Sequence, residues 1–282
     1  MAHAERLLLA GVMGWPISHS RSPELHRYWL SRHGIRGSYV PLAVRPERLL
    51  DALKGLSALG FCGSNVTIPH KEAALALVDR VDAMARRIGA INTVVVAEDG
   101  SLDGFNTDAF GYIESLLEAR PGWRADAGPA VILGAGGSAR AVTAALAERG
   151  AKEIRLLNRT RARADAIARE FGPPVVALPW GEREEALAGA ALLVNATSQG
   201  MERQPPLELS LARLPIAALV SDIVYIPLET PLLAAARKRG NATVNGLGML
   251  LHQGRPAFKA FFGVMPEVTP ELRRMIEATI QS

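Results

Sequence analysis

Apolar and polar residues alternate between two patterns along the first hundred positions. Short apolar runs at 7–14, 37–44 and 60–68 are typical of buried strands. Helical spacing of apolar residues follows each run, over 24–34, 46–60 and 70–89. Residues 91–106 predict a hairpin whose turn is Asp99-Gly100. This alternation predicts a mostly parallel sheet with helices on both faces, and the hairpin predicts one antiparallel strand at an edge.

A second alternating series follows a predicted helix from Ala109 to about Ala119 and a loop over 120–128. Residues 129–160 read as a strand, a glycine turn, a helix and another strand. Two further buried strands are predicted within 190–200 and 218–225, a helix at 230–240 and a short strand at 242–246. The tail from 248 onward has helical spacing. The chain therefore predicts two α/β units, and the C-terminal helices could return to the first.

A glycine-rich stretch follows the first apolar strand of the second series. Gly134-Ala135-Gly136-Gly137-Ser138-Ala139 fits the pattern G-x-G-x-x-A, with a strand before it and a helix after it. In that context Gly134 permits the tight turn, Gly136 lets the backbone approach a pyrophosphate, and Ala139 lets helix and strand pack closely. The unpaired N–H groups at the helix start favour the anionic pyrophosphate. The stretch therefore predicts a dinucleotide-binding unit.

The end of the next strand indicates which dinucleotide is bound. An NAD site places Asp or Glu at that strand end, where it accepts a hydrogen bond from the ribose 2′-hydroxyl. This chain has Asn158-Arg159-Thr160 instead, with Arg163 one turn further on. Guanidinium groups are suited to gripping a 2′-phosphate. The sequence therefore predicts NADP, although Arg163 alone would also fit a solvated helix face.

Short polar side chains interrupt the first series near strand ends, where open α/β sheets bind ligands. They are Ser20, Ser22, Asn65, Thr67, Asn92, Thr107 and Asp108. Each has a structural alternative: Ser22 fits a helix N-cap, Asn92 a turn and Asp108 the first turn of a helix. Together they predict a site for a ligand with several hydroxyl groups. No cluster of His, Cys and carboxylates has metal-ligand spacing, so no metal is predicted.

Lys71 and Asp108 form the ionisable pair expected to carry chemistry. Pro69 suits the first turn of a helix, which places Lys71 near a helix N-terminus. The helix dipole disfavours a cation there, and Asp108 would offset this effect if it lay close. A carbonyl that is being reduced needs a proton donor at its oxygen, and such a pair can supply one. The alternative is an exposed, solubilising lysine, and His70 is expected to shape the turn.

Composition and charge narrow the class of protein. Among 282 residues, 32 basic and 28 acidic side chains leave a net charge of +4. The basic residues are interspersed with acids on helix-like segments such as 159–170, which is typical of solvated helix faces and does not predict nucleic-acid binding. A single cysteine, Cys62, excludes an intrachain disulfide and agrees with a cytoplasmic setting. Neither a signal peptide nor a membrane span is expected.

Taken together and in this order, the motifs resemble those of the shikimate dehydrogenase family along nearly the whole chain. The matching stretches are "GWPISHSRSPELH", "NVTIPHKEAA", "GAINTVV", "NTDAFG", "GAGGSARAV", "NRT", "NATSQGM", "SDIVYIPLETPLL" and "NGLGMLLHQG". The resemblance implies two α/β domains with a cleft between them. Residues 1–107 would form a mostly parallel substrate-binding domain, to which the helices of 247–282 return. Residues 108–246 would form a Rossmann-type NADP-binding domain.

The resemblance also implies an activity and residue roles. The activity is reversible reduction of 3-dehydroshikimate to shikimate by NADPH, in aromatic amino-acid biosynthesis, by a monomer or homodimer. Lys71 and Asp108 would be the catalytic pair. The substrate would be held by Ser20, Ser22, Asn65, Thr67, Lys71, Asn92, Thr107, Asp108, Tyr225 and Gln253. The nucleotide would contact Gly134, Ala135, Gly136, Gly137, Ser138, Ala139, Asn158, Arg159, Thr160, Arg163, Thr197, Ser198, Ile223, Gly246 and Met249.

Three other readings remain open on the sequence. A quinate/shikimate or amino-shikimate dehydrogenase would share this scaffold, but an NAD-preferring version is disfavoured because no acid follows the strand that ends at Asn158. A two-domain folate dehydrogenase also uses a lysine, whereas the paired serines and the Asn-Thr-Asp run favour the shikimate reading. The third is an NADP-binding regulator without catalytic activity, against which the Lys71 and Asp108 pair argues.

Overall fold

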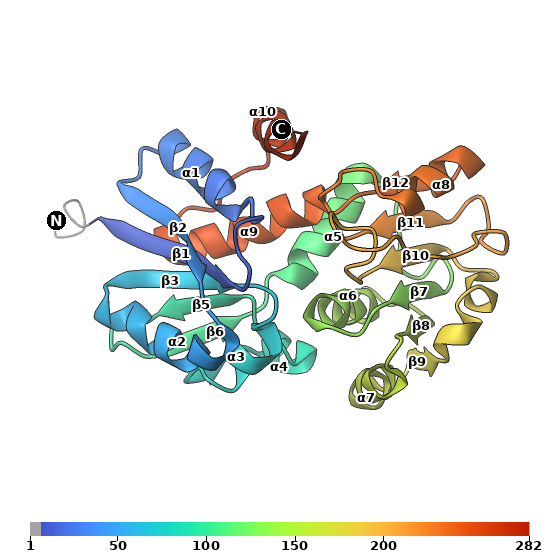
Figure 1. Ribbon diagram of the computed structural model, residues 1–282, viewed down its shortest axis with the longest axis horizontal. Helices are drawn as coiled ribbons and strands as arrows, with labels where there is room; N and C mark the ends of the chain where they lie inside the picture. The colour runs from blue at the N-terminus through green and yellow to red at the C-terminus, as the bar shows by residue number, and fades with distance from the viewer. Residues whose placement is uncertain (1–6, 282) are drawn as a thin grey trace. The chain divides into compact units, whose positions relative to one another are not determined.

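The computed structural model describes residues 7–281, which divide into two compact units. Unit 1 holds the chain up to Thr107 together with Leu251–Ile280, and unit 2 is Asp108–Leu250. Each unit is built on one six-stranded sheet with helices packed against it (Figure 1). The predicted α/β class is therefore confirmed.

The sheet of unit 1 has the strand order β2-β1-β3-β5-β6-β4. Its strands are β1 (Leu8–Gly14), β2 (Gly37–Ala43), β3 (Phe61–Val66), β4 (Arg80–Val81), β5 (Thr93–Val96) and β6 (Leu102–Phe105). Its helices are α1 (Ser22–Arg32), α2 (Leu49–Ala58), α3 (Lys71–Leu75), α4 (Ala83–Ile88), most of α9 (Leu247–Phe262) and α10 (Pro270–Gln281). A 3₁₀ turn, Pro46–Arg48, precedes α2.

The antiparallel strand is not at an edge of this sheet. The hairpin turn at Asp99-Gly100 is confirmed, since β5 and β6 pair antiparallel and Gly100 has a positive φ of 82°. However, β5 also pairs antiparallel with β3, and β6 pairs parallel with β4. The edge prediction was wrong because β4, a two-residue strand too short for periodicity to reveal, occupies the edge.

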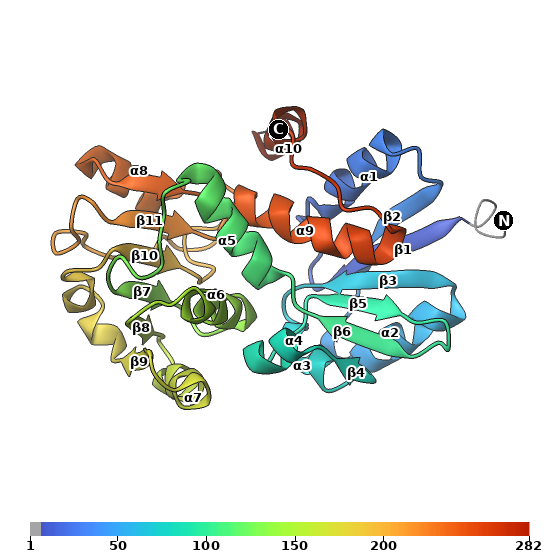
Figure 2. The same cartoon turned by 180° about the vertical axis from the view of Figure 1, so that it is seen from behind.

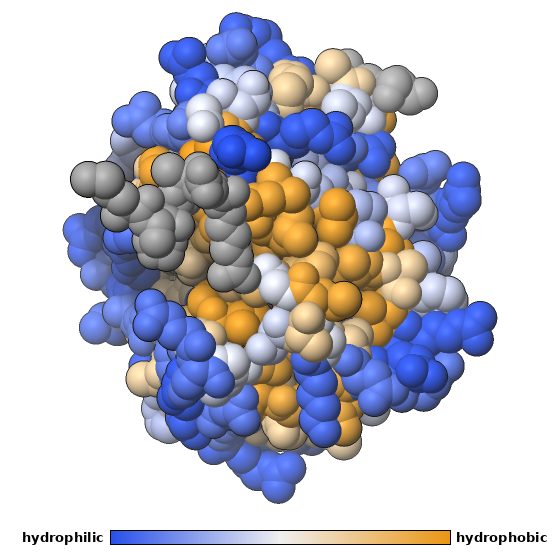
Figure 3. All heavy atoms as spheres, turned by 90° about the vertical axis from the view of Figure 1, so that its left-hand side faces the viewer, coloured by the Kyte–Doolittle hydropathy of each residue, from blue (hydrophilic) through white to orange (hydrophobic). Residues whose placement is uncertain are grey.

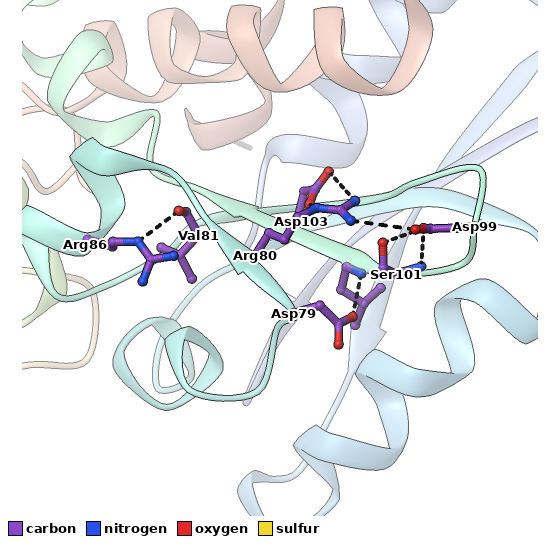
Figure 4. Close-up of polar contacts among 8 residues, drawn as sticks. Asp79, Arg80, Val81, Arg86, Asp99, Ser101 and Asp103 are labelled. Atoms are coloured by element: carbon purple, nitrogen blue, oxygen red, sulfur yellow. Dashed lines mark hydrogen bonds and ion pairs between the residues drawn. The ribbon is translucent and has the colours of Figure 1, made fainter.

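The single helix predicted over 70–89 was also wrong, for the same reason. Backbone groups of Asp79 and Asp82 pair with β6 through Asp79 N to Leu102 O and Asp82 N to Gly104 O, both 3.0 Å. Side chains strengthen this pairing: Arg80 bridges to Asp103, and Asp79 accepts from Leu102 N at 2.8 Å (Figure 4). The Asp82 carboxylate then caps α4 by accepting from Ala85 N at 2.8 Å. Strand pairing and a new N-cap therefore replace the middle of the helix.

The two faces of the unit 1 sheet carry different cores. On one face, leucines of α2 pack with Met13, Val66 and Val94. On the other face lie α1 and α9, as the two opposite views show (Figures 1 and 2). There Trp29 of α1 and Phe258 of α9 meet edge to face, with ring centroids 5.5 Å apart. The aromatic pair joins α9, from the later part of the chain, to α1.

Apolar side chains also gather on the surface of unit 1 at the amino ends of β1 and β2 (Figure 3). The large exposed apolar residues of the described part of this unit include Leu7, which is 50% exposed, and Leu59, which is 70% exposed. The predicted ligand-binding residues follow the opposite, carboxyl ends of these strands. The apolar face is therefore separate from the candidate site.

Unit 2 contains an entirely parallel sheet with the strand order β12-β11-β10-β7-β8-β9. Its strands are β7 (Ala130–Leu133), β8 (Ile154–Leu157), β9 (Val175–Leu178), β10 (Leu192–Asn195), β11 (Leu219–Asp222) and β12 (Ala242–Val244). Its helices are α5 (Asp108–Ala119), α6 (Gly137–Glu148), α7 (Arg161–Phe171) and α8 (Pro231–Arg239), with 3₁₀ turns at Trp180–Glu182 and Glu185–Leu187. Helices α5, α6 and α7 lie on one face, and α8 lies on the other (Figure 1).

Candidate active site

Asn65 sits at the carboxyl end of β3 with 6% of its surface exposed. Its side-chain Nδ2 donates to the Asn92 carbonyl oxygen and to Thr93 Oγ1, both at 3.0 Å. Its Oδ1 accepts from the hydroxyl of Tyr39 at 2.7 Å. These bonds hold a buried amide in one orientation at a strand end, where ligands bind in such sheets.

Asn92, Thr107 and Gln253 form a second hydrogen-bonded group in the same unit. Asn92 Nδ2 lies 2.9 Å from Thr107 Oγ1 and 3.3 Å from Gln253 Oε1. Asn92 Oδ1 accepts from the Thr107 backbone N–H at 2.9 Å. Gln253 belongs to α9, 161 residues after Asn92. Three residues predicted to bind substrate thus meet through a helix that returns from the far end of the chain.

Ser20 and Ser22 lie in the loop that leads into α1. The Ser22 N–H donates to Ser20 Oγ at 3.3 Å. The alternative reading of Ser22 as an N-cap was wrong: the N-cap residue is Arg21, no side chain caps the helix, and Ser22 is its first residue. Ser22 interacts instead with the Tyr39 hydroxyl. The Arg21 guanidinium leaves this loop and donates to the Thr279 carbonyl of α10 at 2.8 Å.

Thr67 and Lys71 flank the turn between β3 and α3. Both are half-buried, and the Thr67 N–H donates to the Met13 carbonyl at 2.9 Å. The ring of His70 donates to the Val44 carbonyl at 2.8 Å, so His70 does shape the turn as expected. Lys71 is the first residue of α3, but α3 has only five residues. The dipole argument for Lys71 therefore loses its basis, because it assumed a long helix.

Asp108 and Tyr225 are the two predicted substrate residues that belong to unit 2. Asp108 is the first residue of α5, as predicted, and is 3% exposed. It directly follows Thr107, whose contacts with Asn92 and Gln253 fix the chain on its N-terminal side. Tyr225 is half-buried and lies three residues after β11.

The glycine turn of unit 2 has the geometry that the sequence predicts for a pyrophosphate site. Gly134 follows β7 with φ of 117°, and a Cβ there would lie 2.6 Å from the Ala196 carbonyl oxygen, so only glycine fits. A Cβ at Gly136 would meet no protein atom within 4 Å. Gly136 is the N-cap of α6, and Ala139 is fully buried in that helix. The protein's own packing thus requires glycine at 134, whereas open space lies beside Gly136 for a ligand.

The segment after β8 presents cationic groups and no carboxylate. Asn158 Nδ2 donates to the Thr160 carbonyl at 2.9 Å and shapes the turn into α7. Arg159 is exposed, and it has no hydrogen bond or ion pair within residues 7–281. Arg161, in contrast, is paired with Asp165 at 2.7 Å. The residues present therefore suit the 2′-phosphate of NADP, with Arg159 available to bind it.

Two residues that the sequence reading missed organise the remaining loops of the nucleotide side. Asn195 ends β10, accepts from Thr197 Oγ1 at 2.7 Å and donates to Asp222 Oδ1 at 3.0 Å. Asp222 ends β11, and its other oxygen accepts from Thr230 Oγ1 at 2.7 Å. Burial raises the pKa of the Asp222 carboxyl, and the Thr230 hydrogen bond opposes that rise. Both residues are polar groups at the ends of apolar strands, which is the signal that identified Asn65.

The other predicted nucleotide residues lie around these loops. Ser198 follows Thr197, and Ile223 donates its N–H to the Asn195 carbonyl at 3.0 Å. A Cβ on Gly246 would overlap the Ile223 carbonyl, so the backbone there also requires glycine. Met249 is 8% exposed in the first turn of α9. All of these positions follow carboxyl ends of parallel strands or begin the next helix. Unit 2 therefore presents them at the carboxyl ends of its strands.

Comparison with known proteins places the chain in a family. Residues 12–94 match the family model described as shikimate dehydrogenase substrate binding domain, and residues 122–203 match the model described as shikimate / quinate 5-dehydrogenase. The first match lies in unit 1 and the second in unit 2. Each match thus covers part of one sheet.

Whole-chain relatives agree with these matches. A shikimate dehydrogenase (NADP(+)) of Rhodospirillum rubrum is 59% identical over 272 residues, which cover 95% of this chain and 96% of the relative. The solved shikimate 5-dehydrogenase of Thermus thermophilus, in complex with NADP(H) and shikimate, is 40% identical with a TM-score of 0.86 over 97% of this chain and all of that one. A quinate dehydrogenase of Corynebacterium glutamicum, in complex with NAD, is 33% identical with a TM-score of 0.87 over 98% of this chain and 99% of that one. The chain belongs to the shikimate dehydrogenase family.

Proposed function

We propose that this chain is an NADP-dependent shikimate dehydrogenase, which reduces 3-dehydroshikimate to shikimate and also catalyses the reverse reaction. The observation that carries the proposal is its likeness to the Rhodospirillum rubrum relative along nearly the full length of both chains. The exposed Arg159 and the absence of an acid at the end of β8 support NADP as the cofactor. The activity belongs to aromatic amino-acid biosynthesis.

The two units take separate tasks in this proposal. Unit 1 holds the substrate, because the hydrogen-bonded groups around Asn65 and Asn92 present neutral donors and acceptors suited to hydroxyls. The proposed substrate residues also include Ser20, Ser22, Thr67, Lys71 and Gln253 and, from unit 2, Asp108 and Tyr225. Unit 2 holds the nucleotide, with the pyrophosphate on the N-terminus of α6 and the 2′-phosphate at Arg159 and Arg163.

The chain's own residues handle the proton of the reaction. NADPH, when bound, supplies the hydride that reduces the carbonyl carbon. Lys71 gives a proton to the carbonyl oxygen, so that the carbonyl becomes a hydroxyl. Asp108 is a buried acidic side chain whose oxygens can accept a hydrogen bond from a substrate hydroxyl. In the reverse direction Lys71 takes the proton from the hydroxyl of shikimate.

The test is an oxidation assay with purified protein, shikimate or quinate, and NADP or NAD. We expect shikimate with NADP to give the highest kcat/KM of the four combinations. Faster turnover of quinate with NAD would replace the proposal with a quinate dehydrogenase, for which the Corynebacterium glutamicum likeness gives the precedent. Absence of turnover in all four, with NADP still bound, would favour the regulator. Lys71→Met should lower kcat at least a hundredfold and leave NADP affinity unchanged; unchanged turnover would remove Lys71 from its role.

We also propose a cytoplasmic monomer or homodimer that binds no nucleic acid. Across residues 7–281, no helix combines the length and apolar character needed to cross a membrane. In the same range, no group of three or more His, Cys, Asp or Glu side chains could hold a metal ion. The single cysteine supports a reducing compartment.

A further inference from the structure

Tyr39, a residue that the sequence reading did not single out, touches two of the proposed substrate-binding residues. It lies in β2 and is 4% exposed. Its hydroxyl donates to Asn65 Oδ1 at 2.7 Å, and the Ser22 hydroxyl also interacts with the phenol oxygen. Tyrosine is common in strands, so its presence in an apolar run carried no signal of function.

The hydrogen bonds around Asn65 determine which group this residue can offer a ligand. The Asn92 carbonyl oxygen can only accept, so the atom that faces it must be Nδ2 of Asn65. The second Nδ2 hydrogen goes to Thr93 Oγ1, whose own hydrogen goes to Asn92 Oδ1 at 2.9 Å. Both Asn65 donors are therefore used, and only a lone pair on Oδ1 remains. Asn65 can accept a hydrogen bond from a substrate hydroxyl but cannot donate one.

The phenol of Tyr39 is held so that it always donates. Because Asn65 Oδ1 is an acceptor, the Tyr39 hydrogen belongs to that bond, and Ser22 then donates to the phenol oxygen. Burial raises the pKa of Tyr39 well above its usual value, so the hydroxyl keeps its proton throughout the working pH range. The ring stacks on the ring of His26, with centroids 3.9 Å apart and an angle of 9° between the planes. Stacking fixes the ring, and the fixed ring fixes the hydroxyl.

We propose that Tyr39 is a positioning residue for substrate binding, which holds Asn65 as a hydrogen-bond acceptor for a substrate hydroxyl and holds the Ser22 hydroxyl beside it. The inference rests on the proposed function and deepens it. Tyr39 selects for a hydroxyl at the position facing Asn65, since a carbonyl or ether oxygen there would meet a lone pair. It acts through Asn65 and Ser22 and takes no part in proton or hydride transfer.

The test is Tyr39→Phe, which keeps the ring on His26 and removes only the hydroxyl. We expect the KM for shikimate to rise about tenfold, which corresponds to about 1.4 kcal/mol. kcat should stay within about twofold and the KM for NADP should not change, because neither the reacting atoms nor unit 2 is altered. Tyr112→Phe is the matched control. Tyr112 is a phenol of unit 2 that is 1% exposed and whose hydroxyl is not bonded to any proposed substrate residue, so its loss should leave the KM for shikimate unchanged.

A double-mutant cycle separates positioning from a general effect on structure. If Tyr39 acts through Asn65, Tyr39→Phe should raise the KM further by less than about twofold in an Asn65→Ala background. A full tenfold rise in that background, or no rise in the wild-type background, would overturn the proposal. Urea unfolding of each variant shows that the proteins compared are folded. The wild-type assay comes first: inactivity towards shikimate would reject the proposed function, whereas an active wild type with an unaffected Tyr39→Phe variant would reject only the role of Tyr39.

Discussion

At the scale of single residues, His26 shows how an ionisable group can belong wholly to the core. Its side chain is completely buried on α1 between Tyr39, Trp29 and Phe258, and neither ring nitrogen has a hydrogen-bond partner within residues 7–281. Burial lowers the pKa of His26 from 6.5 to about 3. The imidazole is therefore neutral in the folded protein and serves as a flat surface for Tyr39.

Replacing His26 should change how stability depends on pH. The folded state binds a proton at His26 only near pH 3, whereas the unfolded chain binds it near pH 6.5. Titration of His26 therefore does not reduce the free energy of unfolding above pH 6.5. As the pH falls from 6.5 toward 3, it lowers that free energy by about 1.4 kcal/mol per pH unit. Between pH 7.5 and 5.5 the wild type should lose about 1.4 kcal/mol from His26. His26→Phe should lose about that much less over the same interval, as measured by urea unfolding at the two pH values.

The control for this prediction is His33→Gln. His33 is an exposed histidine just beyond the end of the same helix. Because this variant removes a histidine from the surface, it shows how much the loss of a histidine outside the core changes the pH dependence of the unfolding free energy. Equal losses for wild type and His26→Phe between pH 7.5 and 5.5 would mean that His26 takes up its proton without unfolding.

Candidate site residues could be predicted from the sequence where a polar side chain interrupts an apolar stretch. Asn65 and Asn92 stood out because amides interrupt apolar strands, and the structure shows both buried and hydrogen-bonded. Tyr39 and His26 did not stand out, because an aromatic ring fits a core without further explanation. Their importance depends on one hydroxyl direction and one stacking contact, which only the packed arrangement defines.

At the scale of elements, α10 is tied to the loop that carries the paired serines. The Arg21 guanidinium donates to the carbonyl of Thr279 in the last turn of α10, at 2.8 Å. Carbonyl groups in the last turn of a helix have no partner within the helix, so a cationic donor both satisfies one and complements the dipole. The Arg21 side chain thus links the C-terminal helix with the loop that carries Ser20 and Ser22.

Arg21→Met keeps the aliphatic chain and removes the donor, so both the serine loop and the end of α10 should become more mobile. We expect faster amide hydrogen exchange in the peptide covering 270–281 and a loss of about 1 kcal/mol or less in unfolding free energy. The KM for shikimate should rise a few-fold because the serine loop is less fixed. Lys54→Met, at an exposed cation of α2 on the opposite face of the sheet, is the control and should change neither quantity. Exchange in 270–281 that matches the wild type would show that α10 holds its place without Arg21.

Elements were predictable where a periodic stretch was long enough to show its period. The helices of the tail and the strands β1, β3, β7 and β10 lie where the apolar pattern put them. The stretch 70–89 failed because Arg80 and Val81 join β6, a partner 23 residues away that local spacing cannot reveal. Strand β9 was not predicted. It is a four-residue edge strand, and its Val176 is exposed, so it has no clear apolar run.

At the scale of the whole molecule, the chain forms two sheets of different type, one in each unit. The sequence predicted in outline that the sheet of unit 1 is mixed and that of unit 2 is parallel, since the only hairpin signal lies in the sequence of unit 1. That α9 and α10 belong with unit 1 was left open by the apolar pattern, and the resemblance to the family implied it. The contact between Asn92 and Gln253 closes a loop of 161 residues, and such a separation leaves no local trace in the sequence.

If the two units bind different ligands, stabilisation by NADP should depend on unit 2 alone. A ligand present at a hundred times its Kd stabilises the form that binds it by about 2.7 kcal/mol. A valine side chain at Gly136 would meet no protein atom around its Cβ, yet it would occupy the space proposed for the pyrophosphate. Gly136→Val should therefore fold normally and lose the NADP-dependent gain, whereas Gly122→Val, at another open position outside the glycine turn, should keep all of it. Urea unfolding with and without NADP measures the gain, and hydrogen exchange locates it, since two units need not unfold as one. NADP protection of 134–139 that survives in Gly136→Val would place the pyrophosphate elsewhere and remove the physical reason for an open glycine at the start of α6.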